Sequence, residues 1–344
     1  MKAAVLEEIN GPLTVDEVGI GEPAFGQVLI KVLVSGICGS QLQEIAGNKG
    51  NGKFVPHLMG HEGAGIVEKI GIGVTKVKPG EKVVMHWRKG DGIESDFPCY
   101  EYKGKKMPSG KVTTFSEYSL VSENRITPVP MDTPDELCAL LGCSLSTALG
   151  TITNEANVLP GESVLIIGAG GLGMSLIKAA RLVSAYPIVA VDIHEHKRAA
   201  SEAMGAHHFI NAHDTSIKDS LKEEFNIEKL DVIIETSGQP ESIAAAIPLL
   251  AGSGRFFFIG QPKPGADVTL TNAYHLFEGE GKTLKATQGG RFSPTTEIPR
   301  YIKLYKAGLL QINDLITHRV KLDDINEAIG LVRAGQASRV LIEL

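Results

Sequence analysis

The sequence predicts an α/β protein in which a β-rich N-terminal half precedes a doubly wound parallel sheet. Three observations indicate this fold class. Short apolar runs bounded by glycine recur in the N-terminal half, and apolar runs alternate with helical patterns from about residue 150 onward. The chain has 344 residues, a length typical of about two domains.

The N-terminal half contains short β-type segments separated by turns. Apolar runs at 28–34 and 63–70 predict two strands, and Pro79-Gly80 predicts a turn between two further β-rich runs. Segment 88–111 has no apolar period and is rich in Gly, Lys and Asp. We therefore expect it to form a surface lobe or loop.

After residue 150 the pattern changes to strands that alternate with helices. This alternation is typical of a parallel, doubly wound sheet. The pattern breaks up from residue 284, and a last amphipathic helix at 322–334 precedes a terminal strand at 339–344. The predicted strands of the sheet are 163–167, 187–191, 231–235 and 255–260, with helices at 172–182 and 240–250.

The composition is that of an ordinary globular protein, with 43% hydrophobic and 22% charged residues. A net charge of −6 does not favour nucleic acid or an anionic membrane. The start "MKAAVLEEIN" lacks the pattern of a signal peptide, and the most apolar stretch, 164–177, is too short to span a bilayer. We therefore expect a cytoplasmic protein. Its four cysteines form no CxxC pair and no disulfide framework.

A glycine-rich loop, "VLIIGAGGLG", lies between a predicted strand and a predicted helix. This context favours a dinucleotide site, in which the loop lets the pyrophosphate approach the backbone at a helix N-terminus. Asp192 ends the next strand and suits a ribose diol, whereas it would repel a 2′-phosphate, so NAD is favoured over NADP. The alternative is a glycine-rich turn without nucleotide. The predicted loop residues are Gly168, Gly170, Gly171, Leu172 and Gly173.

Three potential metal ligands lie far apart in the sequence: Cys38, His61 and Cys143. Two thiolates and one imidazole suit zinc, and three protein ligands leave the open position typical of a catalytic site. Spacing alone does not bring the three together. Each cysteine taken singly is equally a small buried hydrophobe, and His61 between glycines is equally a turn residue.

The order of the motifs "GICGSQL", "GHEGAGIVEKIG", "GVTKVKPGEKVV", "GCSLSTALG" and "VLIIGAGGLG" resembles the zinc-containing medium-chain alcohol dehydrogenases. Segment 283–328, from "TLKATQGG" to "KLDDINEA", looks most like the glutathione-dependent formaldehyde dehydrogenase branch and its bacterial relatives. The resemblance implies a GroES-like catalytic domain at 1–145 and 289–344, a Rossmann NAD-binding domain at 146–288, and an active site in the cleft between them. It also implies a homodimer or homotetramer, often formed through the sheet edge, for which 269–277 is the candidate segment.

The resemblance also implies roles for single residues. Cys38, His61 and Cys143 match the zinc ligands, and Glu62 matches an acidic residue that can transiently bind the metal. Ser40 matches the hydroxyl that takes the substrate proton. The cofactor contacts implied are Thr147 beside the nicotinamide, Lys197 with Asp192 at the adenosine ribose, and Arg339 at the pyrophosphate.

The sequence departs from this family in two places. The usual structural zinc needs four cysteines in the lobe, where this chain has only Cys99, so we expect one zinc per chain. The aspartate that usually bonds the ligand histidine is here Gln41, and a relay histidine two residues further on is Gln43. His57 and His86 are alternative ends for the proton relay, although loop hydrogen bonding is the simpler role for each.

The predicted activity is zinc-dependent hydride transfer between NAD(H) and an alcohol/carbonyl pair. Trp87 matches a position that lines the substrate pocket, and we expect a polyol, cyclitol or sugar-derived secondary alcohol. A thiol adduct of the formaldehyde type or a simple alcohol is the alternative substrate. A zinc-free reductase and a non-catalytic NAD-binding protein are the alternative functions. Basic residues that could meet an anionic substrate, or simply be solvated, are Lys53, Arg88, Lys103, Lys105 and Lys106.

Overall fold

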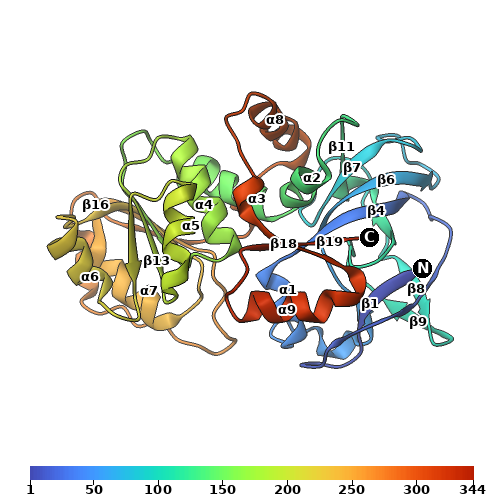
Figure 1. The fold of residues 1–344 in the computed structure, drawn as a ribbon, viewed down its shortest axis with the longest axis horizontal. Coiled ribbons are helices and arrows are strands. Elements are labelled where there is room, and N and C mark those ends of the chain that lie inside the picture. Colours follow the sequence, from blue (N-terminus) through green and yellow to red (C-terminus); the bar gives the residue numbers. More distant parts are fainter. The chain divides into compact units, whose positions relative to one another are not determined.

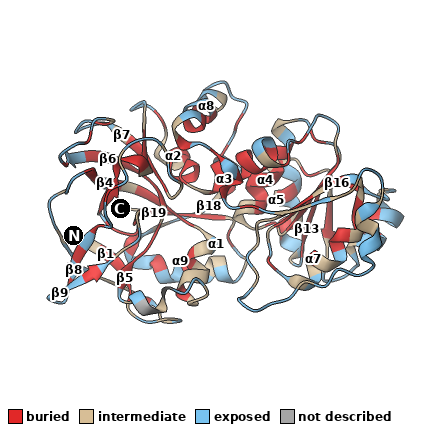
Figure 2. Ribbon diagram, turned by 180° about the vertical axis from the view of Figure 1, so that it is seen from behind, coloured by how far each residue is buried: buried red, intermediate tan, exposed pale blue. Residues whose placement is uncertain are grey.

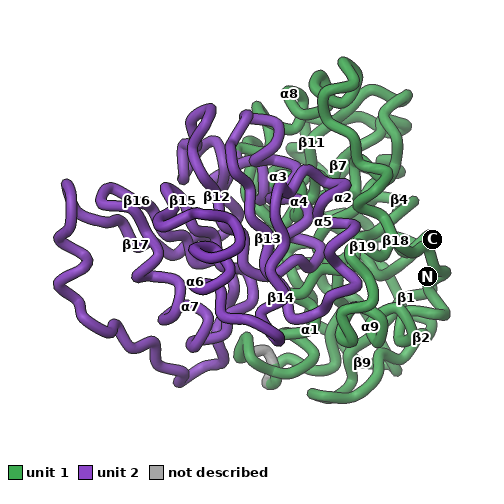
Figure 3. Tube along the Cα trace, turned by 60° about the vertical axis from the view of Figure 1, so that its left-hand side comes forward, with its two compact units in different colours: residues 1–146, 293–344 green, residues 147–292 purple. Residues whose placement is uncertain are grey.

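A computed structural model of the protein describes residues 1–50, 52 and 54–344. These residues form two compact units (Figure 3). The first unit comprises Met1–Ser146 and Ser293–Leu344, and the second comprises Thr147–Phe292. The chain therefore leaves the first unit once and returns to it at its C-terminal end.

The first unit is built on a seven-stranded sheet in which β4 pairs with β6, β10 and β19. The strands predicted at 28–34 and 63–70 fall within β4 and β6. The sheet contains β4 (Gln27–Ile37), β6 (Glu62–Ile70), β7 (Lys82–His86), β10 (Tyr118–Ser122), β11 (Ile126–Val129), β18 (Ile316–Lys321) and β19 (Arg339–Glu343). Two three-stranded sheets accompany it, one of β1 (Lys2–Leu6), β2 (Leu13–Glu17) and β5 (His57–Leu58), the other of β3 (Gly19–Ile20), β8 (Cys99–Tyr102) and β9 (Lys105–Pro108).

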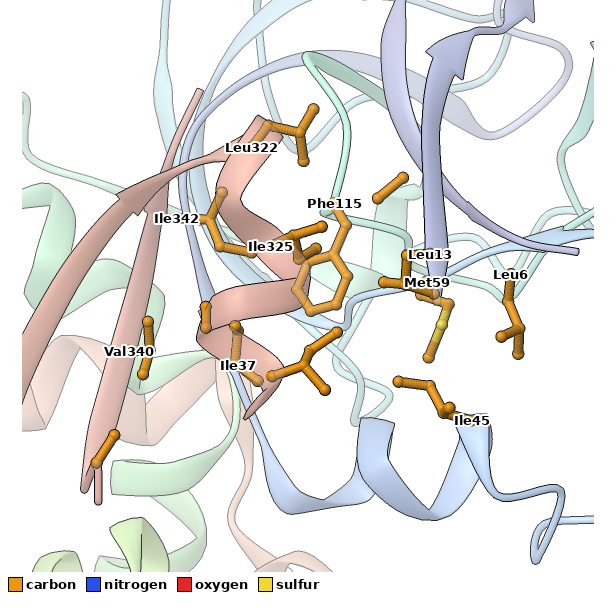
Figure 4. Close-up of a cluster of buried hydrophobic side chains, with 14 residues drawn as sticks. Leu6, Leu13, Ile37, Ile45, Met59, Phe115, Leu322, Ile325, Val340 and Ile342 are labelled. Carbon is orange, nitrogen blue, oxygen red and sulfur yellow. The ribbon is translucent and has the colours of Figure 1, made fainter. Parts of the chain in front are cut away.

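A buried hydrophobic cluster fixes the segments that carry the functional residues of the first unit (Figure 4). Ile37 at the end of β4 and Ile45 at the end of α1 (Gly39–Ile45) both belong to it, so the residue between β4 and α1, Cys38, is held at both sides. Val340 anchors the start of β19 in the same cluster. The other helices of this unit are α2 (Asp135–Leu141), α8 (Pro294–Lys306) and α9 (Ile325–Arg333), and α3 (Ser144–Gly150) runs across the boundary between the units.

The second unit contains a six-stranded parallel sheet, of which two strands, β13 and β16, are labelled in Figure 1. The order of its strands is β14-β13-β12-β15-β16-β17. Counted along the chain, this is the 3-2-1-4-5-6 order of the Rossmann fold, whose switch point lies between β12 and β15. Its central strands are buried on both faces, as parallel strands usually are (Figure 2). The strands are β12 (Val164–Ile167), β13 (Ile188–Asp192), β14 (His208–Asn211), β15 (Leu230–Glu235), β16 (Leu250–Phe258) and β17 (Thr283–Ala286), and the helices are α4 (Gly171–Leu182), α5 (Arg198–Met204), α6 (Ile217–Asp219) and α7 (Pro240–Ala246).

The lobe at 88–111 is not merely a surface loop, because it contains the β8–β9 hairpin. Tyr100, Tyr102 and Met107 point inward from this hairpin and are buried against β1. The turn is Lys103-Gly104, and both of its residues have positive φ, as a tight two-residue hairpin turn requires. The strands are only four residues long, which is too short for their alternation to stand out among the charged residues around them.

Two further expectations differ from the structure. The edge strands of the second unit's sheet are β14 and β17, whereas segment 269–277 forms no strand and ends in a short 3-10 helix, Ala273–Phe277. The sequence after residue 284 has an irregular pattern from which no helix was predicted before residue 322. The structure has α8 there, a helix of 13 residues that begins with Pro294 and contains Pro299. Pro294 is the first residue of the helix, where a missing backbone N–H costs little, whereas Pro299 lies inside the helix and lacks the N–H that would bond the Thr295 carbonyl oxygen.

Among the residues that the structure describes, no single helix is long and apolar enough to cross a membrane, and one bent pair, Asp135–Leu141 with Ser144–Glu155, meets the criterion by length and composition alone.

Candidate active site

The three predicted metal ligands lie together in the first unit. The sulfur atoms of Cys38 and Cys143 and a ring nitrogen of His61 are all within 4.8 Å of one another. Cys38 directly follows β4 and His61 directly precedes β6, and because these strands are antiparallel the two residues meet at one end of the pair.

Cys143 reaches the same point because the residue before it is a glycine. A Cβ atom on Gly142 would lie 2.3 Å from the carbonyl oxygen of Met85 and 2.8 Å from the Cα atom of Glu62. Only a residue without a side chain lets the end of α2 approach β6 and β7 this closely. Sequence reasoning missed Gly142, although its place directly before a ligand cysteine in "LLGCSL" is the available signal.

The donor set has the chemistry that zinc prefers. The two thiols share a hydrogen bond, which holds the pKa of Cys38 well below its ordinary value and raises the pKa of Cys143 well above its own. One thiolate is thus favoured before a cation arrives, and the second proton would leave on binding. Nε2 of His61 is buried and has no hydrogen-bond partner among the described residues. Cys38, Cys143 and His61 would therefore hold a tetrahedral zinc and leave its fourth position open.

Glu62 lies beside this cluster and is fully buried. Its carboxylate accepts a hydrogen bond from the Ser144 N–H at 3.1 Å and lies 3.3 Å from Nη1 of Arg339. Burial raises the pKa of Glu62, while the Arg339 guanidinium opposes that rise. Arg339 is also buried, and its Nη1 contacts the Ile37 carbonyl oxygen at 3.4 Å. Its contact with a pyrophosphate stays a prediction.

Ser40 and Gln41 both face Nδ1 of His61. The Ser40 hydroxyl lies 3.4 Å from this nitrogen, and the Gln41 amide nitrogen is also within hydrogen-bonding distance. Both side chains come from α1, whose first residues follow Cys38. One short helix therefore brings the proposed proton acceptor and the partner of the ligand histidine to the metal cluster.

The two alternative relay histidines are held by other groups. His86 is fully buried, with its ring nitrogens bonded to the Arg88 carbonyl oxygen at 2.6 Å and to the Thr127 hydroxyl at 3.0 Å. Burial lowers the pKa of His86 to about 3, so this ring stays neutral at physiological pH. His57 is buried as well, and its Nδ1 lies 2.9 Å from the Leu58 carbonyl oxygen. These contacts favour structural roles for both.

Within the described part of the chain, Cys38, His61 and Cys143 form the single group of three or more potential ligands close enough to hold a metal. Cys99 is exposed in the lobe. Charged groups anchor the lobe instead: Glu123 accepts hydrogen bonds from three backbone N–H groups, and Glu94 pairs with Lys89 at 2.8 Å and Arg125 at 3.1 Å. Lys89 and Arg125 lower the pKa of Glu94 to about 2, so this anchor is ionised across the physiological range.

The residues proposed to meet an anionic substrate are dispersed. Lys103 pairs with Glu7 at 3.0 Å, and Lys105 and Lys106 are exposed on the hairpin. Arg88 is partly buried, and Lys53 lies outside the described residues. This arrangement favours an ion-paired role for Lys103 and solvated side chains for Lys105 and Lys106.

The glycine loop of the second unit has the geometry of a dinucleotide cradle. Gly168 has a φ of +93°, and a Cβ on Gly173 would lie 1.8 Å from the Gly168 carbonyl oxygen, so both positions require glycine. A Cβ on Gly170 would meet no atom within 4 Å, which leaves the space where a pyrophosphate would approach. Gly171 and Leu172 begin α4, whose free N–H groups would face that anion.

Asp192 ends the neighbouring strand β13, beside this loop. Its carboxylate accepts hydrogen bonds from the Ala169 N–H at 2.8 Å and the His194 N–H at 3.1 Å, and it pairs with Lys197 at 3.2 Å. A carboxylate has about four acceptor sites, so room remains for a ribose hydroxyl. Thr147, the first residue of this unit, has a buried hydroxyl without a partner among the described residues.

The fold and the two sites together define a zinc-binding oxidoreductase with a dinucleotide cofactor, and comparisons with known proteins agree. A model of the alcohol dehydrogenase GroES-like domain matches residues 24–131, and one of zinc-binding dehydrogenases matches residues 171–307. Alcohol dehydrogenase 6 of Peromyscus maniculatus is 32% identical over 368 residues, covering 99% of this chain and 97% of the relative. The chain therefore belongs to the zinc-containing medium-chain alcohol dehydrogenase family, whose members are oxidoreductases of CH–OH donors.

Two other similar proteins extend the comparison. S-(hydroxymethyl)glutathione dehydrogenase of Paracoccus denitrificans is 28% identical over 383 residues, which cover 99% of each chain. The crystal structure of benzyl alcohol dehydrogenase from Acinetobacter calcoaceticus superimposes with a TM-score of 0.89 at 26% identity, covering 100% of this chain and 99% of that one. The predicted GroES-like plus Rossmann fold class is thereby confirmed.

Proposed function

We propose that the protein interconverts an alcohol and its carbonyl compound, with NAD as the hydride acceptor and zinc held by Cys38, His61 and Cys143. The observation that carries this proposal is the convergence of the three donor atoms within 4.8 Å, with the buried Nε2 of His61 lacking another partner. When bound, zinc would supply Lewis acidity at the substrate oxygen. One such ion per chain is expected.

The chain's own residues have separate tasks in this proposal. Ser40 takes the proton of the alcohol, because it is the hydroxyl of α1 that lies beside the ligand His61. Glu62, with Arg339 as its counter-ion, adds a negative charge beside the ligands. Thr147 lies against the nicotinamide, and Asp192 with Lys197 binds the adenosine ribose.

We infer that the substrate carries a second oxygen near the reacting carbon, as a polyol, cyclitol or sugar-derived secondary alcohol does. Trp87 follows β7 at the end where His61 precedes β6, because Glu62 lies opposite His86 in the antiparallel pair. Its indole Nε1 is buried and has no partner among the described residues. An N–H left without an acceptor costs about 1–3 kcal/mol, and a substrate hydroxyl beside the metal cluster would satisfy it.

A panel of substrates tests the proposal. Zinc-loaded protein and NAD are mixed with polyols, cyclitols, sugar alcohols, simple primary alcohols and a thiol adduct of formaldehyde, and NADH absorbance is followed. We expect the highest kcat/KM with a polyhydroxylated secondary alcohol. Best turnover of the thiol adduct would instead support the formaldehyde-type alternative. Tight NADH binding without turnover of any alcohol would contradict the proposed activity.

Trp87→Phe is expected to lower kcat/KM for a polyol by about threefold to tenfold, the effect of one lost hydrogen bond of about 0.5–1.5 kcal/mol. A simple alcohol of similar size is the matched control, because it has no second oxygen to bond Nε1, and its kcat/KM should stay unchanged. An equal loss for both substrates would show that Trp87 acts only through packing.

Asp192 is expected to make the protein prefer NAD over NADP by at least about tenfold in kcat/KM, or about 1.4 kcal/mol. In Asp192→Ala the ribose loses an acceptor and Lys197 loses its counter-ion, so NAD weakens while a 2′-phosphate gains a cation. The difference in kcat/KM between NAD and NADP should therefore become smaller, because kcat/KM falls for NAD and rises for NADP. Asp192→Asn keeps an acceptor but removes the charge, and should reduce this difference less. Equal kcat/KM for the two cofactors in the wild type would contradict this assignment.

A further inference from the structure

The Gln41 side chain links two of the three metal ligands. Gln41 is fully buried and is the third residue of α1. Its carbonyl oxygen Oε1 accepts the backbone N–H of Cys38 at 2.8 Å, and its amide nitrogen faces Nδ1 of His61. One amide therefore caps the helix that presents Cys38 and at the same time orients the ring of His61.

The orientation of this amide is set by Cys38. A backbone N–H is a donor that cannot change its role, so the acceptor end of the amide must face Cys38. The NH₂ end then faces His61 and can only donate, which makes Nδ1 of His61 the acceptor. A neutral imidazole whose Nδ1 accepts carries its proton on the other nitrogen, Nε2.

Nε2 is the ring nitrogen that remains for the metal, because Nδ1 is occupied by Gln41. Binding a cation through Nε2 needs its lone pair and therefore places the proton on Nδ1. That N–H would point at the NH₂ group of Gln41, which is also a donor. The other group near Nδ1, the Ser40 hydroxyl, lies at 3.4 Å, beyond the usual N–H···O distance of about 2.7–3.2 Å. A carboxylate at this position would instead accept from both Cys38 and His61, as the usual partner of a metal-ligating histidine does.

We propose that Gln41 is a positioning residue that holds His61 in place but withholds the acceptor its metal-binding tautomer needs, and so weakens zinc binding at this site. The inference rests on the proposed zinc site and adds a property of it. It predicts that a carboxylate at residue 41 improves zinc binding by the protein. If Gln41 had a purely structural role, replacing it would not improve zinc binding.

The test is the zinc dissociation constant, measured by competition with a chelator at one fixed pH. Gln41→Glu should bind zinc about 10- to 100-fold more tightly than the wild type, the range over which partners of ligating histidines change metal affinity. Glu at this position keeps the bond to the Cys38 N–H, since Glu and Gln both serve in such helix caps. Gln41→Asp offers the same charge on a shorter arm and should shift the constant in the same direction if the Glu variant does not fold.

Gln43→Glu is the matched control for added charge. Gln43 lies on the same helix, is half-buried, and bonds the Asn48 amide at 2.6 Å. It should change zinc affinity by less than about threefold, since a partly solvated charge is screened. Zinc binding in Gln41→Glu and Gln41→Asp no tighter than in Gln43→Glu would overturn the inference while leaving the zinc site intact. A wild type that binds no zinc at all would overturn the proposed function itself.

Discussion

Cys143→Ala is expected to remove zinc from the protein and abolish turnover while NAD binding persists. Only Cys38 and His61 would remain as ligands, and the thiol that completes the 4.8 Å cluster would be gone. Several kcal/mol of charge stabilisation would be lost with the metal, which corresponds to a fall of about 10³ or more in kcat. The glycine loop and Asp192 all lie within Thr147–Phe292, so NAD affinity should change by less than about twofold, or about 0.4 kcal/mol.

Elemental analysis and cofactor binding are the measurements. The wild type should contain about one zinc per chain and Cys143→Ala none. Cys99→Ala removes an exposed thiol, and Cys138→Ala removes a buried one whose pKa is raised to about 12 by burial, so neither should lose zinc. Two equivalents of zinc in the wild type would contradict the single site, and zinc retained by Cys143→Ala would remove that residue from the ligand set.

The cofactor loop was predictable because its determinants are local. Strand β12, the glycines and the start of α4 are consecutive, so the sequence between Val164 and Gly173 displays the whole motif. The physical demands at Gly168 and Gly173 arise within the same few residues. A chemical pattern of this kind can be read without knowing the tertiary fold.

The metal cluster could not be derived from spacing, because its ligands meet only through long-range pairing. Cys38 and His61 come together through the register of β4 with β6, and Cys143 depends on the close approach that Gly142 permits. Family resemblance supplied these residues. Gln41 shows the limit of that approach, since its effect depends on which end of the amide faces Cys38, and only the structure gives that contact.

The lobe shows a second limit. Its composition predicted a surface segment, but two of its ion pairs reach distant parts of the chain. Glu94 pairs with Arg125, 31 residues away, and Lys103 of the β8–β9 hairpin pairs with Glu7, 96 residues away. Charged residues that are close together in sequence indicate a solvated surface. The same residues hold the lobe in place when they form ion pairs with distant parts of the chain. Sequence alone does not distinguish the two.

Ser40→Ala is expected to slow the chemical step by about 10² to 10⁴, the usual range for a positioned proton transfer. The hydroxyl lies 3.4 Å from Nδ1 of His61, and Ser40 belongs to α1, the helix whose N-cap residue is Cys38. Ser40 contributes little packing, since it is only partly buried, so zinc content, NAD affinity and melting temperature should match the wild type. Ser40→Thr retains the hydroxyl and should restore most of kcat.

The pH profile of the wild type separates this role from a histidine relay. Gln41 and Gln43 do not ionise, and the pKa of His86 is lowered to about 3 by burial, so we expect no limb near the ordinary histidine pKa of about 6.5 in alcohol oxidation. More than about a tenth of wild-type kcat in Ser40→Ala, with chemistry rate-limiting, would contradict the role of Ser40. A limb near pH 6.5 that disappears in His57→Gln would show that His57 takes the proton from Ser40 to solvent, because the contacts of His86 leave that ring neutral throughout this range.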